Sequence, residues 1–396
     1  MVRMLRGLVI LAAVVVALHC CELPRRADGR CVLFNFGDSN SDTGSLPAAY
    51  GFYLGPPAGR RFFNRTTGRW SDGRLYIDFI GTYLPCVQTI VRLVPCEQSS
   101  ALRMDACAAE SLGIRYLSPY LESSGSNFTD GVNFAVAGAA AASNQSAIPF
   151  TMATQVNQFL HFKNRTRELR PLGQGSMLSE EDFLGAVYSI DVGQNDITLA
   201  FLANLTLQEI VADGGPLAAA AAKVEESVRA LYGSGARKFW VYNTGPIGCL
   251  PQTLALRQRP GDELDAAGCL ARYNAAARAL NAGLAAACRR LADEYCGSAT
   301  VVCTDMYAVK YDLFANHDWY GIERPLMACC GHGGPPYNYV NLKTCGQPTA
   351  TACPEGERHV SWDGVHYTED ANAIVASKIL SGDFSQPRTK LHALCE

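Results

Sequence analysis

The sequence has no strong excess of charge of either sign, and this argues against a nucleic-acid-binding protein. Its 396 residues include 34 Lys and Arg against 37 Asp and Glu, a formal net charge of −3 at pH 7. Surfaces that bind nucleic acid are usually strongly basic. The sequence also has no internal repeat and no low-complexity linker. We therefore expect a soluble chain with a large core and no nucleic-acid partner.

Long hydrophobic runs are also scarce. The clearest, from Leu8 to Leu18, is shorter than the roughly 20 apolar residues that a membrane-spanning helix needs. Arg3 and Arg6 precede this run and a polar stretch follows it, which is the layout of a secretory signal peptide. We predict a signal peptide over residues 1–21 and no stable membrane insertion. A signal anchor is the alternative.

Cysteine, in contrast, is abundant. The chain has 16 cysteines, of which Cys20 and Cys21 lie in the predicted signal peptide. Disulfides persist in oxidising compartments, so this number favours disulfide pairing in an exported protein. One cluster could alternatively form a zinc site, although no C-x2-C pair has a matching second pair. The cluster consists of Cys329, Cys330, Cys345 and Cys353, with His332 and His359 nearby.

Five Asn-x-Ser/Thr sequons agree with passage through a glycosylating pathway. A single sequon occurs easily by chance, but five sequons and a signal peptide support each other. We therefore expect a secreted, extracellular glycoprotein. The candidate glycosylation sites are Asn64, Asn127, Asn144, Asn164 and Asn204.

Short apolar runs alternate with helical patterns along the chain, which predicts an α/β fold. Strands separated by helices form a parallel sheet that is covered on both faces. Helices are expected over 217–231 and 264–295, where Ala and Leu recur at helical spacing. The expected strands are residues 31–36, 132–135, 186–190, 238–242 and 299–303.

A polar segment, Gly37-Asp38-Ser39-Asn40-Ser41-Asp42, directly follows the first expected strand. Ligands of open α/β sheets bind at the carboxyl ends of the strands, so Ser39 is expected to face a crevice. The alternative is an ordinary Asp/Ser helix cap after a strand. The nucleophile elbow G-x-S-x-G occurs nowhere in the sequence, so the elbow of α/β-hydrolases does not explain this segment.

A carboxylate precedes an imidazole by three residues near the far end of the chain, at Asp363 and His366. A serine nucleophile needs an adjacent base, and that base needs an acid that fixes its tautomer. Asp363 and His366 can supply both. Other histidines lack such a partner and are predicted to be surface or packing residues. They are His161, His317, His332, His359 and His392.

Four sequence blocks occur in an order that resembles the GDSL esterase/lipases, also called SGNH hydrolases. The blocks are Gly-Asp-Ser at Ser39, Gly138, Asn195 in Gly193-Gln-Asn-Asp196, and Asp363-x-x-His366. The plant branch is the most similar, and the resemblance extends from about Cys31 to Leu380. The segments that indicate this branch are Trp70-Ser-Asp-Gly-Arg74, Asn243-Thr-Gly-Pro-Ile-Gly-Cys-Leu-Pro251 and Cys329-Cys-Gly331.

Two positions depart from the usual pattern of this family. Asn40 follows the serine where leucine is common, and Val136-Ala137 precedes Gly138 where many members have smaller or hydroxyl residues. The resemblance nevertheless implies a three-layer α/β/α sandwich with about five parallel strands, a flavodoxin-like arrangement. It implies one hydrolase domain over residues 31–385 with long loop insertions, a C-terminal tail over 386–396, and neither a metal nor an organic cofactor.

The resemblance also implies a role for each residue. Ser39 would be the nucleophile, His366 the general base and Asp363 its partner. The oxyanion hole would consist of the backbone N–H groups of Ser39 and Gly138 and the side-chain amide of Asn195. A glycine N–H can approach a substrate closely, and a neutral amide donates without competing for the proton. The alternative for Asn195 is an Asx turn.

A loop insertion after the serine block mixes arginines with aromatic residues. It can pack its aromatic side chains under itself, which we favour, or it can hold a sugar chain or an aromatic ester. Trp70 and Arg69 are the residues expected to contact a polymeric substrate. The arginines are Arg60, Arg61, Arg65, Arg69 and Arg74, interleaved with Phe52, Tyr53, Phe62, Phe63 and Trp70.

The function expected is ester hydrolysis outside the cell, with an acylated small molecule or polysaccharide as substrate. Our first choice is removal of O-acetyl groups from cell-wall xylan or arabinoxylan, because no apolar lid-like helix is evident. Lipases and phenolic-ester esterases are alternatives. An acyltransferase with the same acyl-enzyme, or a binding protein on an inactive scaffold, would be further possibilities.

Overall fold

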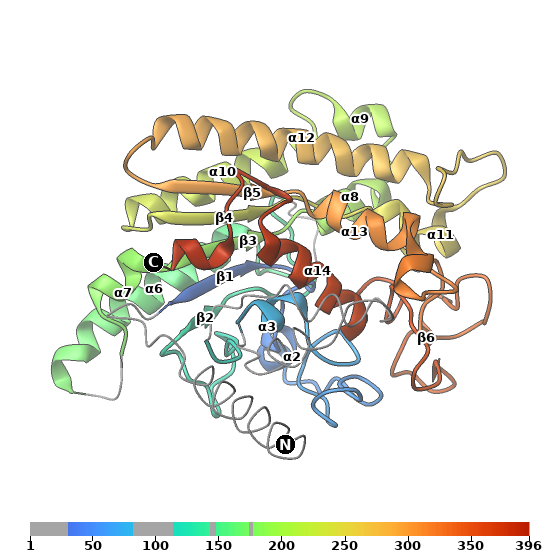
Figure 1. Cartoon of the computed structure of the whole chain (residues 1–396), viewed down its shortest axis with the longest axis horizontal. Helices are drawn as coiled ribbons and strands as arrows, with labels where there is room; N and C mark the ends of the chain where they lie inside the picture. Colours follow the sequence, from blue (N-terminus) through green and yellow to red (C-terminus); the bar gives the residue numbers. More distant parts are fainter. Residues whose placement is uncertain (1–30, 82–113, 143–147, 174–176, 396) are drawn as a thin grey trace, which may run out of the picture.

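The computed structural model describes residues 31–81, 114–142, 148–173 and 177–395. The predicted signal peptide and the sequon at Asn144 lie outside these residues. A six-stranded sheet of order β2-β1-β3-β4-β5-β8 forms the centre of the structure (Figure 1). The first five strands are parallel and β8 is antiparallel. The strands are β1 (Leu33–Gly37), β2 (Gly131–Asn133), β3 (Val187–Asp191), β4 (Lys238–Tyr242), β5 (Thr300–Thr304) and β8 (Ser385–Gln386).

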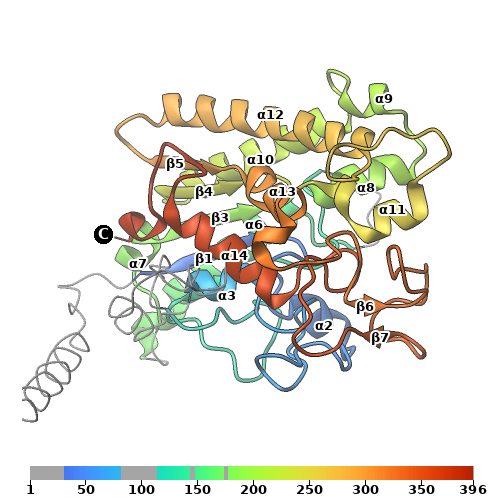
Figure 2. The same ribbon diagram turned by 45° about the vertical axis from the view of Figure 1, so that its right-hand side comes forward.

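Helices cover both faces of this sheet, as the two views in Figures 1 and 2 show. One face packs on α6 (Met152–Leu169), α7 (Glu180–Gly185), α8 (Gln194–Leu202), α9 (Leu207–Val211), α10 (Pro216–Gly233) and α12 (Ala271–Glu294). The other face packs on α3 (Tyr76–Gly81), α13 (Met306–Ala315) and α14 (Glu369–Ser381). The other short elements include α2 (Ser45–Tyr50), α11 (Pro251–Arg257) and the antiparallel pair β6 (Cys330–Gly331) and β7 (Thr351–Ala352). Three of the 3-10 helices are η1 (Arg170–Leu172), η2 (Ile247–Cys249) and η3 (His317–Tyr320).

The alternation of side chains between the two faces of each strand explains why helices cover both faces of the sheet. In β4, Phe239 and Val241 belong to the core on the α6 side, whereas Trp240 and Tyr242 belong to the core on the α14 side. Successive side chains of a strand point to opposite faces, so a sheet covered on both faces favours apolar residues at successive positions. The predicted three-layer α/β/α sandwich with about five parallel strands is confirmed.

The expected secondary structure agrees with the structure except at the start of the longest helix. Each of the five expected strands is present within two residues, and α10 covers the helix expected over 217–231. The helix expected from residue 264 begins at Ala271. The preceding residues are held in another conformation by the disulfide between Cys249 and Cys269 and by a short bridge between Leu264 and Leu270.

The C-terminal segment that we expected as a tail packs onto the sheet. Strand β8 pairs with β5, and the 3-10 helix η4 (Leu391–Leu394) places Leu391 and Leu394 in the core. A disulfide joins Cys395 to Cys31, immediately before β1.

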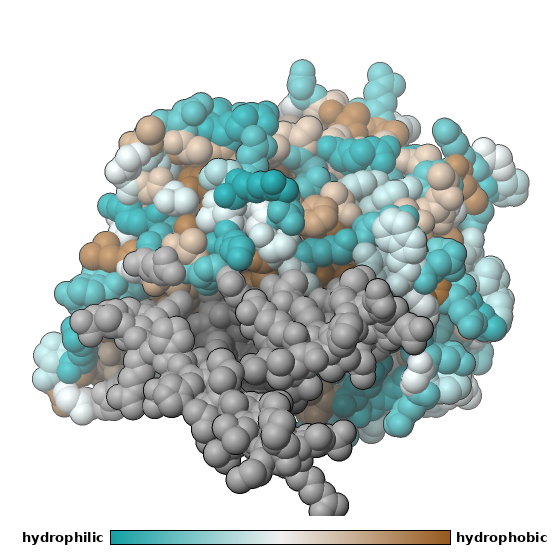
Figure 3. Space-filling model, viewed as in Figure 1, coloured by the Kyte–Doolittle hydropathy of each residue, from teal (hydrophilic) through white to brown (hydrophobic). Residues whose placement is uncertain are grey.

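The described surface in Figure 3 is a mixture of hydrophilic and weakly polar residues with scattered hydrophobic ones. Scattered exposed apolar side chains are normal on soluble domains. Within the residues that the structure describes, no helix combines the length and apolar character needed to cross a membrane.

Candidate active site

The carboxyl ends of three neighbouring strands bring three of the predicted residues to one edge of the sheet. Ser39 follows β1, Gly138 follows β2 and Asn195 follows β3, and β1 lies between the other two strands. The chain leaves β1 toward β2 on one side and later enters β3 on the other side. Crevices that bind ligands form where the strand order reverses in this way.

Ser39 lies on a tight turn between β1 and α2 and is 5% exposed. A Cβ atom on Gly37 would lie 2.4 Å from the carbonyl oxygen of Asp191, so glycine is needed where β1 and β3 approach each other. The carboxylate of Asp42 accepts hydrogen bonds from the backbone N–H groups of residues 44–46 at the start of α2. Asp42 therefore has the capping role that was the alternative for this segment, and Ser39 does not.

Gly138 lies in a loop fixed beside the Ser39 turn. The backbone N–H of Ala137 donates to Oδ2 of Asp42 over 2.8 Å. Gly138 has a φ of +81°, and a Cβ atom there would lie 2.7 Å from Cγ1 of Ile148. Both the backbone conformation and the wall formed by Ile148 therefore require glycine at this position.

Asn195 and Asp196, at the start of α8, hold the loop that follows β2. Asn195 Nδ2 donates to the carbonyl oxygen of Ala139 over 2.8 Å. Asp196 accepts from the N–H groups of Ala141 and Ala142 at 2.7 and 2.9 Å. The amide of Asn195 therefore reaches a distant loop, which differs from the local Asx turn that we considered. The amide lies beside Ala139, which is the residue that follows Gly138.

Asp363 and His366 form the pair that the sequence predicts. His366 Nδ1 lies 2.6 Å from Asp363 Oδ2, while Asp363 Oδ1 accepts from the N–H groups of Val365 and His366. Burial would raise the pKa of Asp363, but the adjacent imidazole and these hydrogen bonds lower it below its ordinary value. A carboxylate held in this way fixes the orientation of the ring through Nδ1, which is the geometry that a histidine base requires.

Trp70 lies between His366 and the apolar residues that precede Gly138. Its ring lies 5.5 Å from the His366 ring, centre to centre, and it also packs on the apolar cluster that includes Val136 and Ala137. Within the described residues, Ser39 Oγ makes no hydrogen bond to His366. Catalytic hydrogen bonds of this kind often tighten only when substrate is bound.

Several arginines of the insertion bond to other segments of the chain, as Arg61 does to Asp370 and Arg74 to Glu369. Phe52, Tyr53 and Phe62 are exposed, so the packing of aromatic side chains under the loop that we favoured is only partly present.

Arg69 is 6% exposed and donates from Nε and Nη2 to both carboxylate oxygens of Asp78, at 2.8 and 2.7 Å. The guanidinium of Arg74 lies 3.9 Å from the centre of the Phe62 ring. The prediction that Arg69 contacts a polymeric substrate is therefore wrong, because its donors are already used in a buried ion pair.

The cysteine cluster that resembled a zinc site forms disulfides. Cys329 pairs with Cys353, and Cys330 pairs with Cys345. Among the described residues, no group of three or more His, Cys, Asp or Glu side chains has the arrangement needed to hold a metal ion. His359, one of the two nearby histidines, is buried and contacts the carbonyl oxygen of Met327 through Nδ1, which fits the predicted packing role.

The four candidate glycosylation sites within the described residues are all exposed. They are Asn64, Asn127, Asn164 and Asn204. Exposure is required for a glycan on the folded protein, so each of the four remains a candidate.

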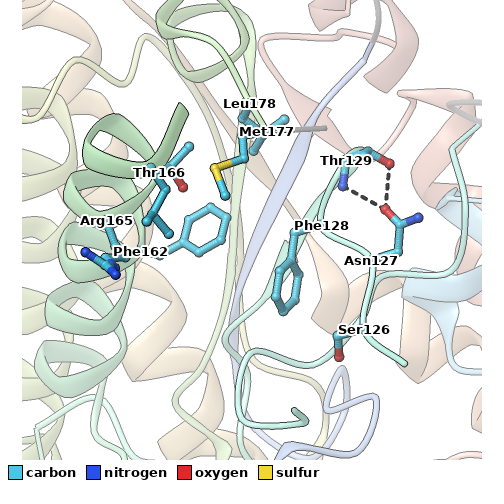
Figure 4. Close-up of a pocket in the computed structure, with 10 residues that line it drawn as sticks. Ser126, Asn127, Phe128, Thr129, Phe162, Arg165, Thr166, Met177 and Leu178 are labelled. Atoms are coloured by element: carbon cyan, nitrogen blue, oxygen red, sulfur yellow. Dashed lines mark hydrogen bonds between the residues drawn. The ribbon is translucent and has the colours of Figure 1, made fainter. Parts of the chain in front are cut away.

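A cavity of about 410 Å³ lies away from the site, between α6 and the segment that precedes β2 (Figure 4). The rings of Phe128 and Phe162 face it, and Met177 and Leu178 close another side. Phe128 precedes the amino end of β2, whereas Gly138 follows the carboxyl end of that strand. The cavity is therefore separate from the turn that carries Ser39.

Two residues beside the site were not predicted from the sequence. Ile148 contacts Gly138, as described above, and Lys310 is buried and donates to the side chain of Asn40. Asn40 itself carried a signal, because a polar residue in place of leucine next to a buried serine needs a hydrogen-bonding partner.

Comparison with known proteins gives consistent results. The chain matches the GDSL-like Lipase/Acylhydrolase family over residues 33–379. It is 45% identical over 380 residues to a GDSL esterase/lipase of Arabidopsis thaliana, which covers 95% of this chain and 91% of the relative. A second GDSL esterase/lipase of the same plant is 43% identical over 386 residues, or 96% and 94%. Alpha-L-fucosidase 3 of Arabidopsis thaliana is 36% identical over 382 residues, 92% of each chain.

Proposed function

Because the chain belongs to the GDSL-like lipase/acylhydrolase family, we propose that it removes O-acetyl groups from cell-wall polysaccharide of the xylan type. The family and the relatives make the protein a carboxylic ester hydrolase, as the sequence predicts. The identity of the polysaccharide, the catalytic roles of individual residues and export from the cell belong to the proposal.

Ser39, His366 and Asp363 are the proposed catalytic residues. Ser39 Oγ attacks the acetyl carbonyl carbon while His366 Nε2 takes the hydroxyl proton. The bond from the acetyl carbon to the sugar oxygen then breaks, and His366 returns the proton to that oxygen. A water molecule repeats the sequence at the acyl-enzyme and releases acetate. The 2.6 Å contact between Asp363 and His366 supports this assignment because it orients the base.

The proposed oxyanion hole combines donors from the segments that follow three neighbouring strands. The negative charge that develops on the carbonyl oxygen would be bound by the backbone N–H groups of Ser39 and Gly138 and by the amide of Asn195. The hydrogen bond from Asn195 to the carbonyl oxygen of Ala139 supports this grouping, since it places the amide beside the Gly138 loop.

The crowded apolar wall around Gly138 is the observation that favours a small acyl group. Ile148 lies against Gly138, and Trp70 lies against His366, so large side chains stand on both sides of the proposed reaction centre. An acetyl group fits beside such a wall more easily than a long acyl chain, and specificity would then come from the sugar.

Exposed aromatic side chains beside the site suit a sugar polymer. Tyr50, Phe52 and Tyr53, on α2 and the residues after it, are 52%, 41% and 74% exposed. Tyr50 lies edge-on to Phe150, which belongs with Trp70 to the apolar side chains packed near Gly138. Such rings provide flat apolar surfaces on which sugar rings can stack.

Acetate release from acetylated xylan, compared with hydrolysis of 4-nitrophenyl acetate, tests the substrate. We expect Tyr53→Ala to lower kcat/KM for the polymer about 3- to 10-fold, corresponding to the ~0.5–1.5 kcal/mol of an aromatic contact, without changing hydrolysis of the small ester. Trp319→Ala is the matched control, because Trp319 is similarly exposed, at 72%, on the 3-10 helix η3 (His317–Tyr320).

Substrates of other classes complete this experiment. Triglycerides and phenolic esters represent the alternative esterases, and a fucosylated oligosaccharide represents the activity named for one relative. Rapid cleavage of long-chain or phenolic esters without any acetate from acetylated xylan or arabinoxylan would rule out the polysaccharide assignment. The classification as an ester hydrolase would be unaffected.

Export is supported by four disulfides among the described cysteines and by the four exposed sequons. The protein purified from a plant host should shift to lower mass after N-glycosidase treatment and should lack the residues of the predicted signal peptide. A chain with residues 1–21 retained and no glycan would contradict export.

A further inference from the structure

A buried lysine faces the turn that carries Ser39. Lys310, on α13, is 3% exposed, and its Nζ donates to Oδ1 of Asn40 over 3.3 Å. The same nitrogen lies 4.7 Å from the centre of the Tyr367 ring. A Cβ atom on Gly245 would lie 2.8 Å from Cδ of Lys310, so glycine at 245 leaves space for the lysine stem. The ammonium is therefore enclosed, and its position is well defined.

Two buried carboxylates accompany this ammonium. Asp38 directly precedes Ser39, Asp191 ends β3, and the backbone N–H of Asp38 donates to the carbonyl oxygen of Asp191. Asp191 Oδ2 accepts from the hydroxyl of Tyr76 over 2.8 Å, and burial raises its pKa. Burial and the charge of Asp191 raise the pKa of Asp38 to about 7, while Lys310 opposes the shift. The ammonium of Lys310 lies close enough to favour the charged form of both carboxylates, while its hydrogen bond goes to Asn40 rather than to either of them.

Asn40 connects this charged cluster to two segments of the proposed oxyanion hole, the turn that carries Ser39 and the start of α8 that carries Asn195. Its Nδ2 donates to Asp38 Oδ1 over 2.9 Å and to Gln194 Oε1 over 3.3 Å. Gln194 immediately precedes Asn195 at the start of α8. One hydrogen-bonded path therefore extends from Lys310 to the turn after β1 and to the turn after β3. This path also accounts for asparagine, instead of leucine, at position 40.

We propose that Lys310 is a positioning residue, which balances the charge of Asp38 and Asp191 and keeps Ser39 and Asn195 in register through Asn40. Without the ammonium, two carboxylates would face each other in a buried site, where charges interact strongly. Their repulsion would displace the turn that carries Ser39, and their charge would oppose the negative oxyanion.

Lys310→Met tests this proposal because methionine retains much of the apolar stem without the charge. With 4-nitrophenyl acetate at pH 8, we expect kcat to fall about 10- to 100-fold, the range expected when a reacting group is misplaced, while KM changes less. The loss should be smaller at pH 5, which lies below the raised pKa of Asp38, so that one of the two negative charges is removed. The groups that face the cluster are Asp38, Asp191, Tyr76, Tyr242 and Tyr367.

A second substitution separates charge balance from packing. The double variant Lys310→Met/Asp191→Asn removes one negative charge together with the cation, and we expect it to recover most of the lost kcat at pH 8. Lys163→Met is the matched control. Lys163 is also buried, on α6, and its Nζ donates to the carbonyl oxygen of Ser234 far from the site. Its replacement should leave kcat unchanged in the folded protein.

Three outcomes would overturn the proposal. The first is a folded Lys310→Met protein with the wild-type kcat from pH 5 to 9. The second is a loss of kcat that does not vary with pH and that Asp191→Asn does not reverse, since Lys310 would then only fill space. The third is failure of both variants to fold, which would make the lysine a requirement of the whole fold. A double variant that folds and is active, when the single variant does not fold, would support charge balance.

This inference depends on ester hydrolysis at Ser39 but not on the proposed polysaccharide. Absence of acetate release from xylan would leave it intact, provided that 4-nitrophenyl acetate is hydrolysed. Full activity of Ser39→Ala would remove both proposals.

Discussion

The two sides of strand β1 differ sharply in chemistry. Phe34 belongs to an aromatic cluster on the α6 side, where its ring lies 5.1 Å from Phe159, 5.4 Å from Phe183 and 5.2 Å from Tyr188. Its neighbour Asn35 points to the opposite side. Asn35 Nδ2 donates there to Asn133 Oδ1 over 2.8 Å, and Asn35 Oδ1 accepts from the hydroxyl of Ser189 on β3.

The polar side extends directly to the Ser39 turn. Asn35 also donates to the hydroxyl of Ser41, and Asn133 donates to the carbonyl oxygen of Ser41 and to the hydroxyl of Thr43. Hydrogen bonds are directional, whereas apolar packing depends mainly on area and volume. The aromatic side of β1 therefore contributes stability, and the polar side sets the geometry of the turn. Substitutions on each side should separate these two effects.

The largest effect is expected for activity on the polar side. Ser39→Ala and His366→Ala should each lower kcat by about 10⁴-fold or more, since the proposed catalytic residues act as one unit. The midpoint of thermal unfolding should stay close to that of the wild type, because neither change empties a core position. Full esterase activity in a folded Ser39→Ala protein would end the assignment of the nucleophile.

On the aromatic side, Phe159→Ala should mainly lower stability. Phe159 lies on α6 and is fully buried against Phe34 of β1, so we expect a loss of about 3–5 kcal/mol in the free energy of unfolding. Urea titration measures this loss. At a temperature where the variant remains folded, kcat should be near the wild-type value. A large fall in kcat without a change in stability would show that the two sides are not separable.

Asn195→Ala should lower kcat by about 10²–10³-fold, the usual effect of removing one oxyanion donor. The expected change in KM is small, because the donor acts mainly in the transition state. Steady-state kinetics with 4-nitrophenyl acetate provides the measurement. A change confined to KM would instead assign Asn195 to substrate binding.

Asn133→Ala should change both the stability and the activity, so it tests whether the two sides of β1 are separable. It leaves Asn35 and the Ser41 carbonyl without their buried partner, and we expect about 1–3 kcal/mol of lost stability. The Ser39 turn should also lose its support, so kcat should fall while the protein remains folded. Parallel urea titration and kinetics test this, and an unchanged kcat would show that the turn holds its geometry without Asn133.

The smallest expected effect is a difference in pH dependence. Because the pKa of Asp38 is raised to about 7 in the folded state, the folded protein binds this proton more tightly than the unfolded chain. This contribution to stability is present at acidic pH and is lost as the pH rises toward 7. Asp38→Asn should therefore lose less stability than the wild type between pH 5 and pH 8 in urea titrations. Equal losses would contradict the shift.

The sequence predicts the apolar framework and the site residues at strand ends, but not the pairs that join distant segments. Strand β4 could be assigned because Phe239 to Tyr242 form an unbroken run of apolar and aromatic residues. Nothing local indicates that Lys310 on α13 approaches Asn40, because that contact depends on how α13 packs on the sheet. Arg69 illustrates the same limit: its neighbour Trp70 contacts His366, while Arg69 itself turns toward Asp78.

The disulfide between Cys31 and Cys395 joins two residues that are 364 positions apart in the sequence. It closes the chain between them into a covalent ring. A single protease cut in an exposed connection, such as residues 212–214 between α9 and α10, would open this ring without releasing either piece. Strands β1, β2 and β3 would then lie on one fragment and β4 and β5 on the other, still joined through the sulfur atoms. Nicking would add only the mass of one water to the molecule, and the two fragments would separate only after a reductant is added. A protein cut at the surface could therefore retain Ser39 and His366 in one molecule.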